Sequence, residues 1–489
     1  MSAESLLARP FGTISELVRL HAALRPDHLA LLQDERRVTY GELDRRMDRI
    51  ASGLRHQGVG DGERIAICAH NSIEYALLFL GALRAGVVPA LIPPNLAPET
   101  LDAMAADSGA RSTWHDDDLA RLPDHDAAPQ EPAIAPTHAF NIIYSSGTTG
   151  VPKGIVQPAS MRWRHMQRGV ANQMGPQATT IIATPFYSNT TLVAFFPALA
   201  LGATAVLMGK FDAGEYLELA ERHRVTHTML VPVQYQRILA VPGFDRHDLS
   251  SFRIKLSTSA PFGAELKREV LDRWPGGLVE YYGTTEGGAT CILAAHLHPD
   301  KLHTVGPPGP GVELKLIDED GREVAKGEAG EVAGHSGAMM TGYHNRPEET
   351  AKAEWFDTAG KRYIRTGDVG RFDADGFLTL IDRRKDMIIS GGFNVFPSDL
   401  EAVVRAHPAV AEVVVVGMPS QRWGETPVAF VVPKARGVEP GELLRWANER
   451  LGKVQRLAAL EIVPDLPRNA IGKVLKRSLR EAWQDRLHL

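Results

Sequence analysis

The sequence is poor in cysteine, carries no large excess of charge of either sign, and contains no internal repeat or low-complexity tract. Its two cysteines, Cys68 and Cys291, are far apart, which excludes a disulfide framework and the ligand spacing of a zinc finger. The formal net charge of -5 gives no sign of a nucleic-acid or anionic-membrane partner. These absences favour a globular protein of the reducing cytoplasm.

One uncharged stretch, 190–209, has the length of a membrane span, about 20 residues. Pro197 and Gly202 interrupt it, so we expect a buried helix over Thr191–Leu201 followed by a buried strand over Ala203–Met208. The N-terminal segment carries an acidic residue and lacks a long apolar core, so it does not resemble a secretory signal. We therefore expect neither a membrane span nor a signal peptide.

The length of 489 residues and the hydrophobic content of 44% are enough for several globular domains with cores of their own. Over the first part of the chain, short apolar runs alternate with amphipathic stretches, as in Ile65–Cys68, Ser72–Arg84 and Val87–Leu91. This alternation predicts layered α/β architecture with largely parallel sheets. Glycine and proline are dense over 305–311, and the strand-like pieces that follow, Glu313–Ile317 and Gly330–Ala333, predict a smaller β-rich subdomain.

After Arg383 the pattern changes to that of a compact α+β unit. The charged segment Asp382–Asp386 lies at the change; such a run is usually a solvated loop, and here a hinge is the sharper interpretation. We predict an N-terminal domain over 1–383 and a small mobile C-terminal domain over 384–489.

The most informative stretch is YSSGTTGVPKG at 144–154, which follows a strand-like run. Glycines let the backbone approach an anion closely, the hydroxyls can donate to phosphate oxygens, and Lys153 adds a positive charge. A plain Ser/Thr/Gly turn is the alternative. The stretch is not the P-loop G-x-x-x-x-G-K-[ST], because Pro152 precedes Lys153 and Gly154 follows it. It predicts a different loop for a polyphosphate.

A second motif, YYGTTEG at 281–287, offers a tyrosine for a nucleobase face, threonines for phosphate and a carboxylate for Mg²⁺. A third motif, RTGD at 365–368, ends in an aspartate that can accept hydrogen bonds from both ribose hydroxyls, although Asp in a glycine turn is often only a turn former.

The fourth motif, LPRNAIGK at 466–473, ends in Lys473. A lysine can relieve the repulsion between an attacking carboxylate and the α-phosphate of ATP. Its alternative is a surface lysine in a basic tail.

In this order, and together with VTYGEL at 38–43 and LRAGVVP at 83–89, these motifs resemble the signatures of the acyl-adenylate-forming family. That family includes acyl-CoA synthetases, the adenylation domains of peptide synthetases and firefly luciferases. The resemblance covers nearly the whole chain and implies ATP, Mg²⁺ and coenzyme A as cofactors and a small carboxylic acid as substrate. It also implies that Arg383 contacts ribose and phosphate, and that Lys385 is a pivot between two arrangements.

The stretch SGGFNVFPSDLE at 390–401 bears on the acceptor of the acyl group. CoA ligases typically carry S-G-G-x-N-V-x-P here, and adjacent glycines suit a narrow channel for the pantetheine arm. We therefore expect a free-standing carboxylate–CoA ligase that forms acyl-AMP and then the thioester. The alternatives are an enzyme that loads a carrier protein, and a nucleotide-binding protein or P-loop NTPase without synthetase activity. The sequence leaves open whether the enzyme is a monomer or a homodimer.

Three departures from the family pattern concern the acid. Ser188 replaces the usual histidine of P-x-[FY]-H, and Thr258 stands where a glycine often lines the acyl pocket. The segment 453–456 lacks the proline of K-x-P, which changes only a loop. The run 187–191 is uncharged, so we expect a neutral, apolar or aromatic acid.

Two other clusters have weaker interpretations. His296, His298 and His303 lie in a loop without a second group of ligands, so we do not expect a metal site there. The basic run 162–165 is expected to be a helix face, with contact to CoA phosphates as the alternative.

The predicted site residues fall into groups by role. The catalytic residues are Lys473, Thr285 and Glu286, and Glu286 is also the metal ligand. The nucleotide and CoA residues are Ser145, Ser146, Gly147, Thr148, Thr149, Gly150, Lys153, Ser259, Ala260, Tyr282, Gly283, Thr284, Asp368, Arg383, Lys385, Gly391 and Gly392. The acyl-pocket residues are Tyr187, Ser188, Thr258 and Gly288.

Overall fold

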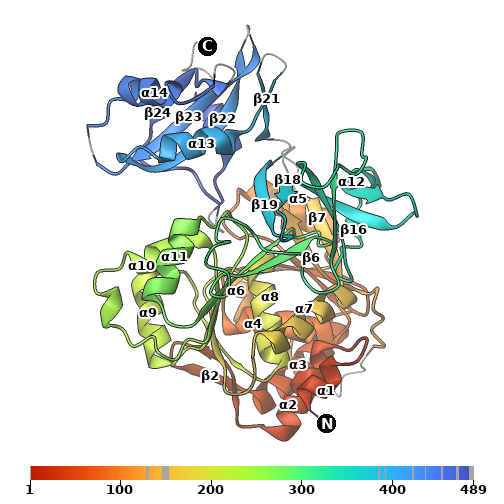
Figure 1. Cartoon of the computed structure of the whole chain (residues 1–489). Coiled ribbons are helices and arrows are strands. Elements are labelled where there is room, and N and C mark those ends of the chain that lie inside the picture. The colour runs from red at the N-terminus through yellow and green to blue at the C-terminus, as the bar shows by residue number, and fades with distance from the viewer. Residues whose placement is uncertain are drawn as a thin grey trace. The chain divides into compact units, whose positions relative to one another are not determined.

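The computed structural model describes residues 2–127, 132–145, 153–383, 386–390, 393–420, 423–435, 437–452, 455–469 and 473–483 (Figure 1). The chain divides into two compact units. The first comprises Met1–Leu314 and Ala333–Arg365, and the second comprises Lys315–Val332 and Thr366–Leu489. The domain boundary predicted at 383/384 stays a prediction.

A mixed sheet crosses the first unit. In spatial order its strands are β13 (Thr290–Ala294), β12 (Gly277–Gly283), β11 (Ile254–Ser257), β10 (His227–Leu230), β8 (Thr179–Ile182), β9 (Thr204–Leu207), β1 (Leu29–Gln33) and β2 (Arg36–Thr39). The central pairs from β12 to β1 are parallel, and the pair at each end is antiparallel. The predicted layered α/β sheet is confirmed.

A second sheet of this unit carries the predicted phosphate loop. Its strands are β16 (Gly342–Tyr343), β7 (Lys153–Pro158), β6 (Ala139–Ser145), β4 (Val88–Leu91), β3 (Arg64–Cys68) and β5 (Thr113–His115). Both faces are buried: Ile65 and Ile67 enter one hydrophobic core, whereas Ala66 and Cys68 enter another. This alternation follows from the two-residue period of a strand.

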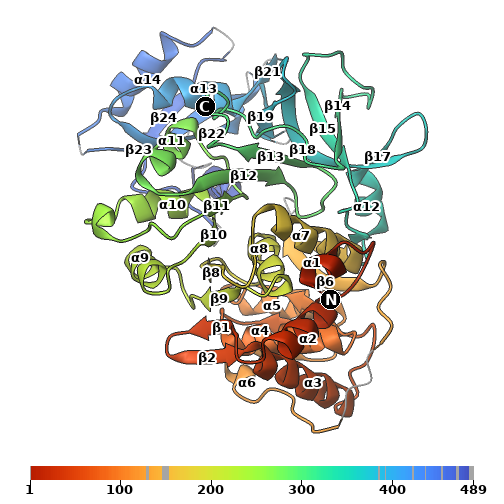
Figure 2. The ribbon, with the colours of Figure 1, turned by 60° about the horizontal axis from the view of Figure 1, so that its bottom comes forward.

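Helices of the first unit cover these sheets. They are α1 (Ala3–Leu7), α2 (Ile14–Leu24), α3 (Tyr40–His56), α4 (Ile73–Arg84), α5 (Pro98–Ser108), α6 (Asp116–Leu119), α7 (Ala159–Ala171), α8 (Asn189–Ala200), α9 (Ala213–Arg222), α10 (Pro232–Leu239), α11 (Ala264–Arg273) and α12 (Pro347–Ala353). One core contains residues of both sheets together with α2, α3, α4, α7 and α8. Figure 2 shows α7 and α8 side by side within it. None of the described helices is long and apolar enough to cross a membrane.

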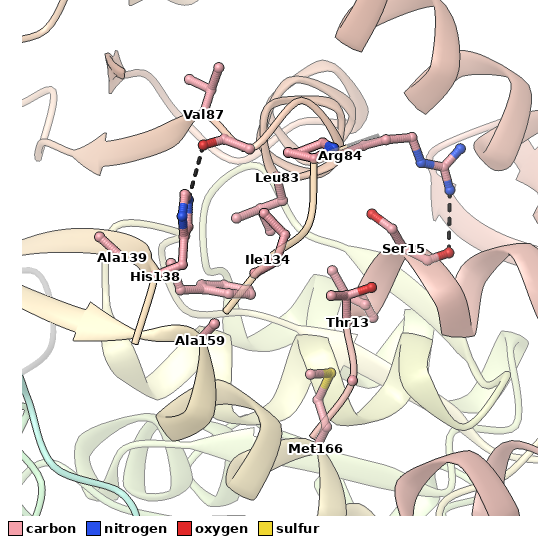
Figure 3. A pocket seen from close by; sticks show the side chains of 15 residues that line it. Thr13, Ser15, Leu83, Arg84, Val87, Ile134, His138, Ala139, Ala159 and Met166 are labelled. Atoms are coloured by element: carbon pink, nitrogen blue, oxygen red, sulfur yellow. Dashed lines mark hydrogen bonds between the residues drawn. The ribbon is translucent and has the colours of Figure 1, made fainter. Parts of the chain in front are cut away.

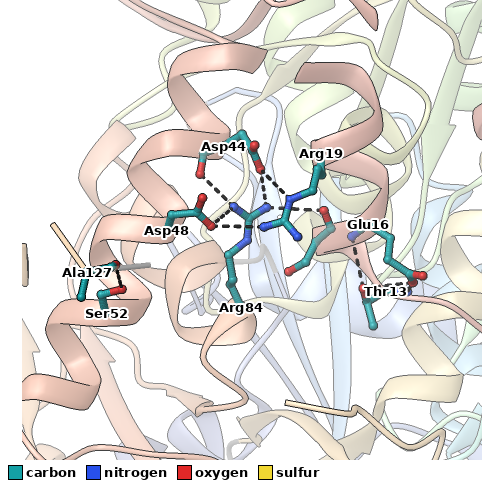
Figure 4. Close-up of polar contacts among 9 residues, drawn as sticks. Thr13, Glu16, Arg19, Asp44, Asp48, Ser52, Arg84 and Ala127 are labelled. Atoms are coloured by element: carbon teal, nitrogen blue, oxygen red, sulfur yellow. Dashed lines mark hydrogen bonds and ion pairs between the residues drawn. The ribbon is translucent and has the colours of Figure 1, made fainter. Parts of the chain in front are cut away.

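Arg84, at the end of α4, ties three helices together (Figure 4). Its buried guanidinium lies 2.6 Å from a carboxylate oxygen of Asp44 and 2.7 Å from one of Asp48, both on α3. It also donates to the backbone carbonyl of Ser15 on α2, at 3.4 Å. A charge out of water needs such partners, so the packing of α2, α3 and α4 depends on this cluster.

Further strands follow along the chain. They are β14 (Glu313–Ile317), β15 (Gly330–His335), β17 (Glu354–Phe356), β18 (Arg362–Phe372) and β19 (Leu378–Arg383). Strand β18 pairs antiparallel with β17 before Arg365 and with β19 after it. The strands predicted at 313–317 and 330–333 are confirmed.

The second unit ends in the predicted α+β fold. Its sheet has the order β21 (Phe393–Val395), β20 (Ile388–Ser390), β23 (Gly424–Pro433), β22 (Val410–Ser420), and β24 (Ala459–Ile462) pairs with β23. Along β22, Val413 and Val415 enter a core with α13 (Pro397–Arg405) and α14 (Pro440–Asn448). Val414 and Val416 enter another with α15 (Lys476–Trp483).

Candidate active site

The two strands that flank the predicted phosphate loop form an antiparallel hairpin. Strand β6 pairs with β7 so that Tyr144 lies opposite Gly154 and Ser145 opposite Lys153. The structure therefore fixes both ends of the loop. The residues predicted between them, Ser146, Gly147, Thr148, Thr149 and Gly150, lie outside the described residues, as does the side chain of Ser145.

Lys153, the cation predicted to meet phosphate, has a carboxylate partner in this structure. Its ammonium forms an ion pair with Glu349 on α12 and lies 5.2 Å from the ring centroid of Tyr343. The pKa of Glu349 is lowered to about 2, first by the hydrogen bond from Lys153 and then by the one from Lys352. Glu349 is thus ionised at neutral pH, and a phosphate that approached Lys153 would compete with it.

Glu286, the predicted Mg²⁺ ligand, is held by its side chain and by its backbone. The hydroxyl of Tyr343 donates to its Oε1 at 2.7 Å, and the backbone N–H of Met340 donates to its carbonyl at 2.7 Å. Burial first, and the neighbouring Glu286 second, raise the pKa of Tyr343. Tyr343 therefore stays protonated and can act as a donor across the physiological range.

The two glycines after Glu286 allow this turn to pack closely against the backbone of the segment 334–338. Gly287 and Gly288 have φ angles of 78° and 80°, in the left-handed region that favours glycine. A Cβ on Gly287 would lie 2.1 Å from the carbonyl oxygen of Ala338, and one on Gly288 would lie 2.4 Å from that of Gly334. Gly288, predicted to line the acyl pocket, is buried and serves this close approach.

The start of α8 and the loop after β11 come together at the predicted acyl pocket. The hydroxyl of Thr190 is hydrogen-bonded to that of Ser259, a residue with a left-handed φ of 81°. The side chain of Ser188 caps α8 and accepts from the N–H of Thr190 at 3.3 Å. Thr258 and Ala260 flank Ser259 and are half-buried.

Asn71, which no motif marked, holds the turn before α8. Its amide donates to the carbonyl of Thr184 at 2.8 Å, and its Oδ1 accepts from the N–H of Phe186 at 2.8 Å. The adjacent Tyr187 is half-buried, which raises the pKa of its hydroxyl. The turn that carries Tyr187 and Ser188 is therefore fixed from a distant part of the sequence.

Other predicted nucleotide residues lie on and after β12. Tyr282 is buried and pairs with Cys291 across β12 and β13, and Gly283 ends β12. The hydroxyl of Thr284 donates to the carbonyl of Gly287 at 3.5 Å, which closes the turn that contains Thr285. The structure thus brings 282–288 into one compact turn.

In the second unit, the two predicted ribose residues are in contact. Asp368 on β18 lies directly opposite Arg383 on β19, and the Arg383 Nε is 2.8 Å from a carboxylate oxygen of Asp368. Asp368 is only 7% exposed, and its backbone N–H donates to the hydroxyl of Thr366 at 3.1 Å. This geometry leaves a buried carboxylate with a fixed orientation.

Lys473, in the second unit, is hydrogen-bonded to Asn469 through its backbone. Its backbone N–H donates to Oδ1 of Asn469 at 2.9 Å, and its carbonyl accepts from the N–H of Asn469 at 3.0 Å. Arg468, just before, forms an ion pair with Glu412 on β22. Lys385, Gly391 and Gly392, predicted as pivot and CoA channel, lie outside the described residues.

Two further expectations concern metal and basic residues. Among the residues that the structure describes, no group of three His, Cys, Asp or Glu side chains is placed to hold a metal ion. A lone carboxylate at Glu286 fits a Mg²⁺ ion bound mainly by phosphate oxygens. Of the run 162–165, Arg162, Trp163 and His165 are buried and form a helix face that points into the core.

A mainly apolar cavity lies between the start of α2, the end of α4, the segment 132–140 and α7, and residues of the motif 83–89 contribute to its lining (Figure 3). Its titratable side chains are already engaged. Arg84 has the carboxylates described above, and Nε2 of His138 lies 3.0 Å from the carbonyl of Gly86. The cavity therefore brings no reactive group to a substrate.

The sequence matches the profile of the AMP-binding enzyme family over residues 18–344 and that of the AMP-binding enzyme C-terminal domain over 399–473. A feruloyl-CoA synthase of Amycolatopsis sp is 33% identical, over 94% of this chain and 97% of that protein. A fatty acid–[acyl-carrier-protein] ligase of Streptomyces coeruleorubidus is 32% identical, over 97% of each.

A solved structure of similar fold is the o-succinylbenzoate CoA synthetase of Bacillus subtilis in complex with its acyl-adenylate intermediate. It has a TM-score of 0.83 at 29% identity and covers 95% of this chain and 97% of that chain. The same enzyme with ATP and a magnesium ion has a TM-score of 0.81 at 29% identity, over 95% and 98%.

The chain belongs to the acyl-adenylate-forming family of AMP-binding enzymes. Within that family it is an AMP-forming acid–thiol ligase.

Proposed function

We propose that this protein is an ATP-dependent carboxylate–CoA ligase that acts on a neutral, apolar or aromatic acid. The observation that carries the proposal is the similarity, over nearly the full length of both chains, to enzymes named as CoA ligases. The turn that carries Thr284, Thr285 and Glu286 supports it, because the Thr284–Gly287 hydrogen bond closes this turn and Tyr343 holds the Glu286 carboxylate. ATP and CoA are substrates of such ligases, and the reducing cytoplasm is where we place the reaction.

In the first half-reaction, a carboxylate oxygen attacks the α-phosphorus of ATP, and the bond to the bridging oxygen of pyrophosphate breaks. The hydroxyls of Thr284 and Thr285 and the loop 145–150 would bind phosphate, and Glu286 would hold Mg²⁺. The bound ion supplies positive charge between phosphate oxygens. Asp368 would accept the ribose hydroxyls, with Arg383 keeping its carboxylate in place. Lys473 would neutralise the negative charge that builds at the α-phosphate.

In the second half-reaction, the CoA sulfur attacks the acyl carbon, and the bond to the AMP oxygen breaks. We infer that the C-terminal domain turns about Lys385, which withdraws Lys473 and presents Gly391 and Gly392 to the pantetheine arm. Such alternation lets one pocket serve two transition states while the mixed anhydride stays shielded from water.

The residues around the start of α8 support a neutral acid. Tyr187, Ser188, Thr190, Thr258 and Ser259 carry no formal charge, so none of them could pair with a second carboxylate. The aromatic acid named for the feruloyl-CoA synthase is consistent with this chemistry. Thr258, with a side chain in place of the usual glycine, should narrow the pocket.

A panel of acids with ATP and CoA tests the proposal. Short, medium and long-chain fatty acids, benzoic and cinnamic acids, and the dicarboxylic acids malonate and succinate would be compared by pyrophosphate release, AMP formation and thioester formation. We expect AMP and thioester in equal amounts with a monocarboxylic acid. Formation of ADP in place of AMP, or a preference for malonate, would contradict the proposal.

A second acceptor deserves a direct comparison, because a relative of nearly equal identity is named as a ligase for the acyl-carrier protein. CoA and a phosphopantetheinyl carrier protein would be offered together after the acid is known. We expect transfer to CoA. A large excess of acylated carrier would assign the protein to carrier loading instead.

A further inference from the structure

A buried cluster of polar side chains lies beneath the Thr285–Glu286 turn, and no motif predicted it. Asn141 on β6, Gln157 on β7 and Arg162 on α7 are each 0% exposed. Nε2 of Gln157 donates to the backbone carbonyl of Thr285 at 2.8 Å and to Oδ1 of Asn189 at 3.4 Å. Oε1 of Gln157 accepts from Nδ2 of Asn141 at 3.2 Å and from the guanidinium of Arg162.

Every hydrogen-bonding position of the Gln157 amide is therefore used. An amide has two N–H donors and an oxygen with two lone pairs, and this one meets two acceptors and two donors. Its orientation follows from those partners, because a flipped amide would set its N–H groups against the donors of Asn141 and Arg162. Asn141 and Arg162 thus fix the orientation of the Gln157 Nε2 group, which donates to the Thr285 carbonyl.

Arg162 helps to fix the orientation of the Gln157 amide, but its buried charge lowers the folding stability of the protein. Its partners in the described part of the chain are neutral: Oδ1 of Asn141 at 3.1 Å, Oε1 of Gln157, and Nδ1 of His165 at 3.3 Å. Burial lowers the pKa of Arg162 to about 9. A buried charge without an opposite charge is unfavourable for folding, so its presence points to a role other than stability.

The Thr285 carbonyl belongs to the peptide bond between Thr285 and Glu286, and the proposed reaction uses both of these residues. Met340 and Tyr343 hold Glu286 by its carbonyl and its carboxylate. The Gln157 amide holds the peptide that joins Thr285 to Glu286. The same amide reaches Asn189, the first residue of α8, next to the proposed acyl pocket.

We propose that Gln157, fixed by Arg162 and Asn141, is a positioning residue that sets the Thr285–Glu286 turn for adenylation and spaces it from the acyl pocket. This inference rests on the proposed function, because it assigns the turn to ATP and Mg²⁺. Gln157 touches neither substrate. Its effect should therefore fall on the first half-reaction, in which triphosphate and Mg²⁺ are handled.

The variant Gln157→Glu tests the inference. A glutamate has the same shape, still accepts from Asn141 and Arg162, and gives Arg162 an opposite charge, but as a carboxylate it cannot donate to Thr285. We expect an unfolding temperature equal to or above that of the wild type. We also expect the rate of acid-dependent ATP–pyrophosphate exchange to fall about tenfold, the size of effect that one lost hydrogen bond can have. Transfer from supplied acyl-AMP to CoA should stay near the wild-type rate.

Gln167→Glu is the matched control. Gln167 also lies on α7 and donates to backbone carbonyls, of Leu7 at 2.7 Å and Arg9 at 3.2 Å, far from the turn in sequence. The same chemical change there should leave both half-reactions unchanged.

Arg162→Met is the second variant: it removes the buried charge and leaves the Gln157 oxygen with Asn141 alone. We expect a several-fold loss confined to adenylation.

These measurements test the proposed ligase function and the positioning role of Gln157 separately. A wild-type enzyme without acid-dependent pyrophosphate exchange would overturn the proposed function itself. An active wild type with a folded Gln157→Glu variant that adenylates at the normal rate would overturn the positioning role. Equal loss in both half-reactions would also overturn it, since that is the effect of a purely structural residue. If Gln157→Glu does not fold, the same readouts on Arg162→Met decide.

Discussion

Lys153, at the end of the predicted phosphate loop, forms an ion pair with Glu349 on α12, a residue distant in sequence. The pair lies beside Tyr343, whose hydroxyl holds Glu286. The end of the phosphate loop and the predicted metal ligand are thus connected through one short segment of the first unit. Substitution of Glu349 or of Glu286 should therefore have measurable effects.

Replacing Glu349 should make stability less sensitive to acid. The folded-state pKa of Glu349 is about 2, below the ordinary 4.5, because of Lys153 and then Lys352. Its stabilising effect is therefore present above pH 4.5 and is lost as the pH falls from 4.5 through 2. We expect Glu349→Gln to lower the unfolding temperature slightly at pH 7, and the difference from the wild type to shrink below pH 4.5.

The exposed Glu348 on the same helix provides the control. Glu348→Gln removes a carboxylate without touching the pair, so thermal unfolding followed over the same pH series should track the wild type. If the Glu349→Gln difference were constant with pH, the ion pair would not be its cause.

Lys473→Ala should slow adenylation by about 10²–10³, because a preorganised charge opposite the developing negative charge is lost. Transfer from supplied acyl-AMP to CoA should change much less. The exposed Arg477 on α15, paired with Glu481, gives a control for charge removal, and Arg477→Ala should leave both half-reactions intact. Equal slowing of both halves by Lys473→Ala would assign a different role to the lysine.

Asp368→Asn should affect both half-reactions, in contrast to Lys473→Ala. The ribose is present in ATP and in acyl-AMP, and the substitution weakens both the acceptor and its ion pair with Arg383. We expect the KM for ATP and the KM for supplied acyl-AMP each to rise at least about tenfold. Steady-state kinetics with the exposed Asp375→Asn as control would check this, and an unchanged KM for acyl-AMP would count against ribose binding.

Gly287→Ala should destabilise the protein more than Gly311→Ala. Both glycines have left-handed φ angles, 78° and 70°, but a Cβ on Gly287 would meet the Ala338 carbonyl at 2.1 Å, whereas Gly311 has open space around it. Backbone strain alone costs about 1–2 kcal/mol, and overpacking adds about 1–3 kcal/mol at Gly287. Denaturant unfolding of both variants measures the difference, and equal losses would mean that the 338–340 segment moves aside.

Much of the fold could be predicted because its elements are strongly patterned. The apolar run at Ile65–Cys68 and the amphipathic stretch at Ser72–Arg84 are where the structure has β3 and α4. The hairpin of β1 and β2 was not predicted, since its second strand begins with two arginines and its place depends on pairing with the distant β9.

The site could be predicted only as far as its motifs reach. The strand-like run before the phosphate loop was predicted and corresponds to β6, but neither its pairing with β7 nor the contact between Asp368 and Arg383 was predicted. The partners Tyr343, Glu349 and Gln157 could not be predicted, because they lie 57, 196 and 128 residues from the residues they hold. Such contacts arise when β16 pairs with β7 and when the turn after β12 folds over both.

Arg84 shows how one interior cation can constrain the evolution of a whole region. Its guanidinium is shared between two aspartates of α3 and a carbonyl of α2, so losing both acids while keeping the arginine would leave a buried charge without these opposite charges. Substitutions at these positions should therefore be correlated: descendants that lose both aspartates should also lose the arginine. We expect sites 44, 48 and 84 to covary across natural relatives, as a record of compensation and independent of the substrate each relative uses.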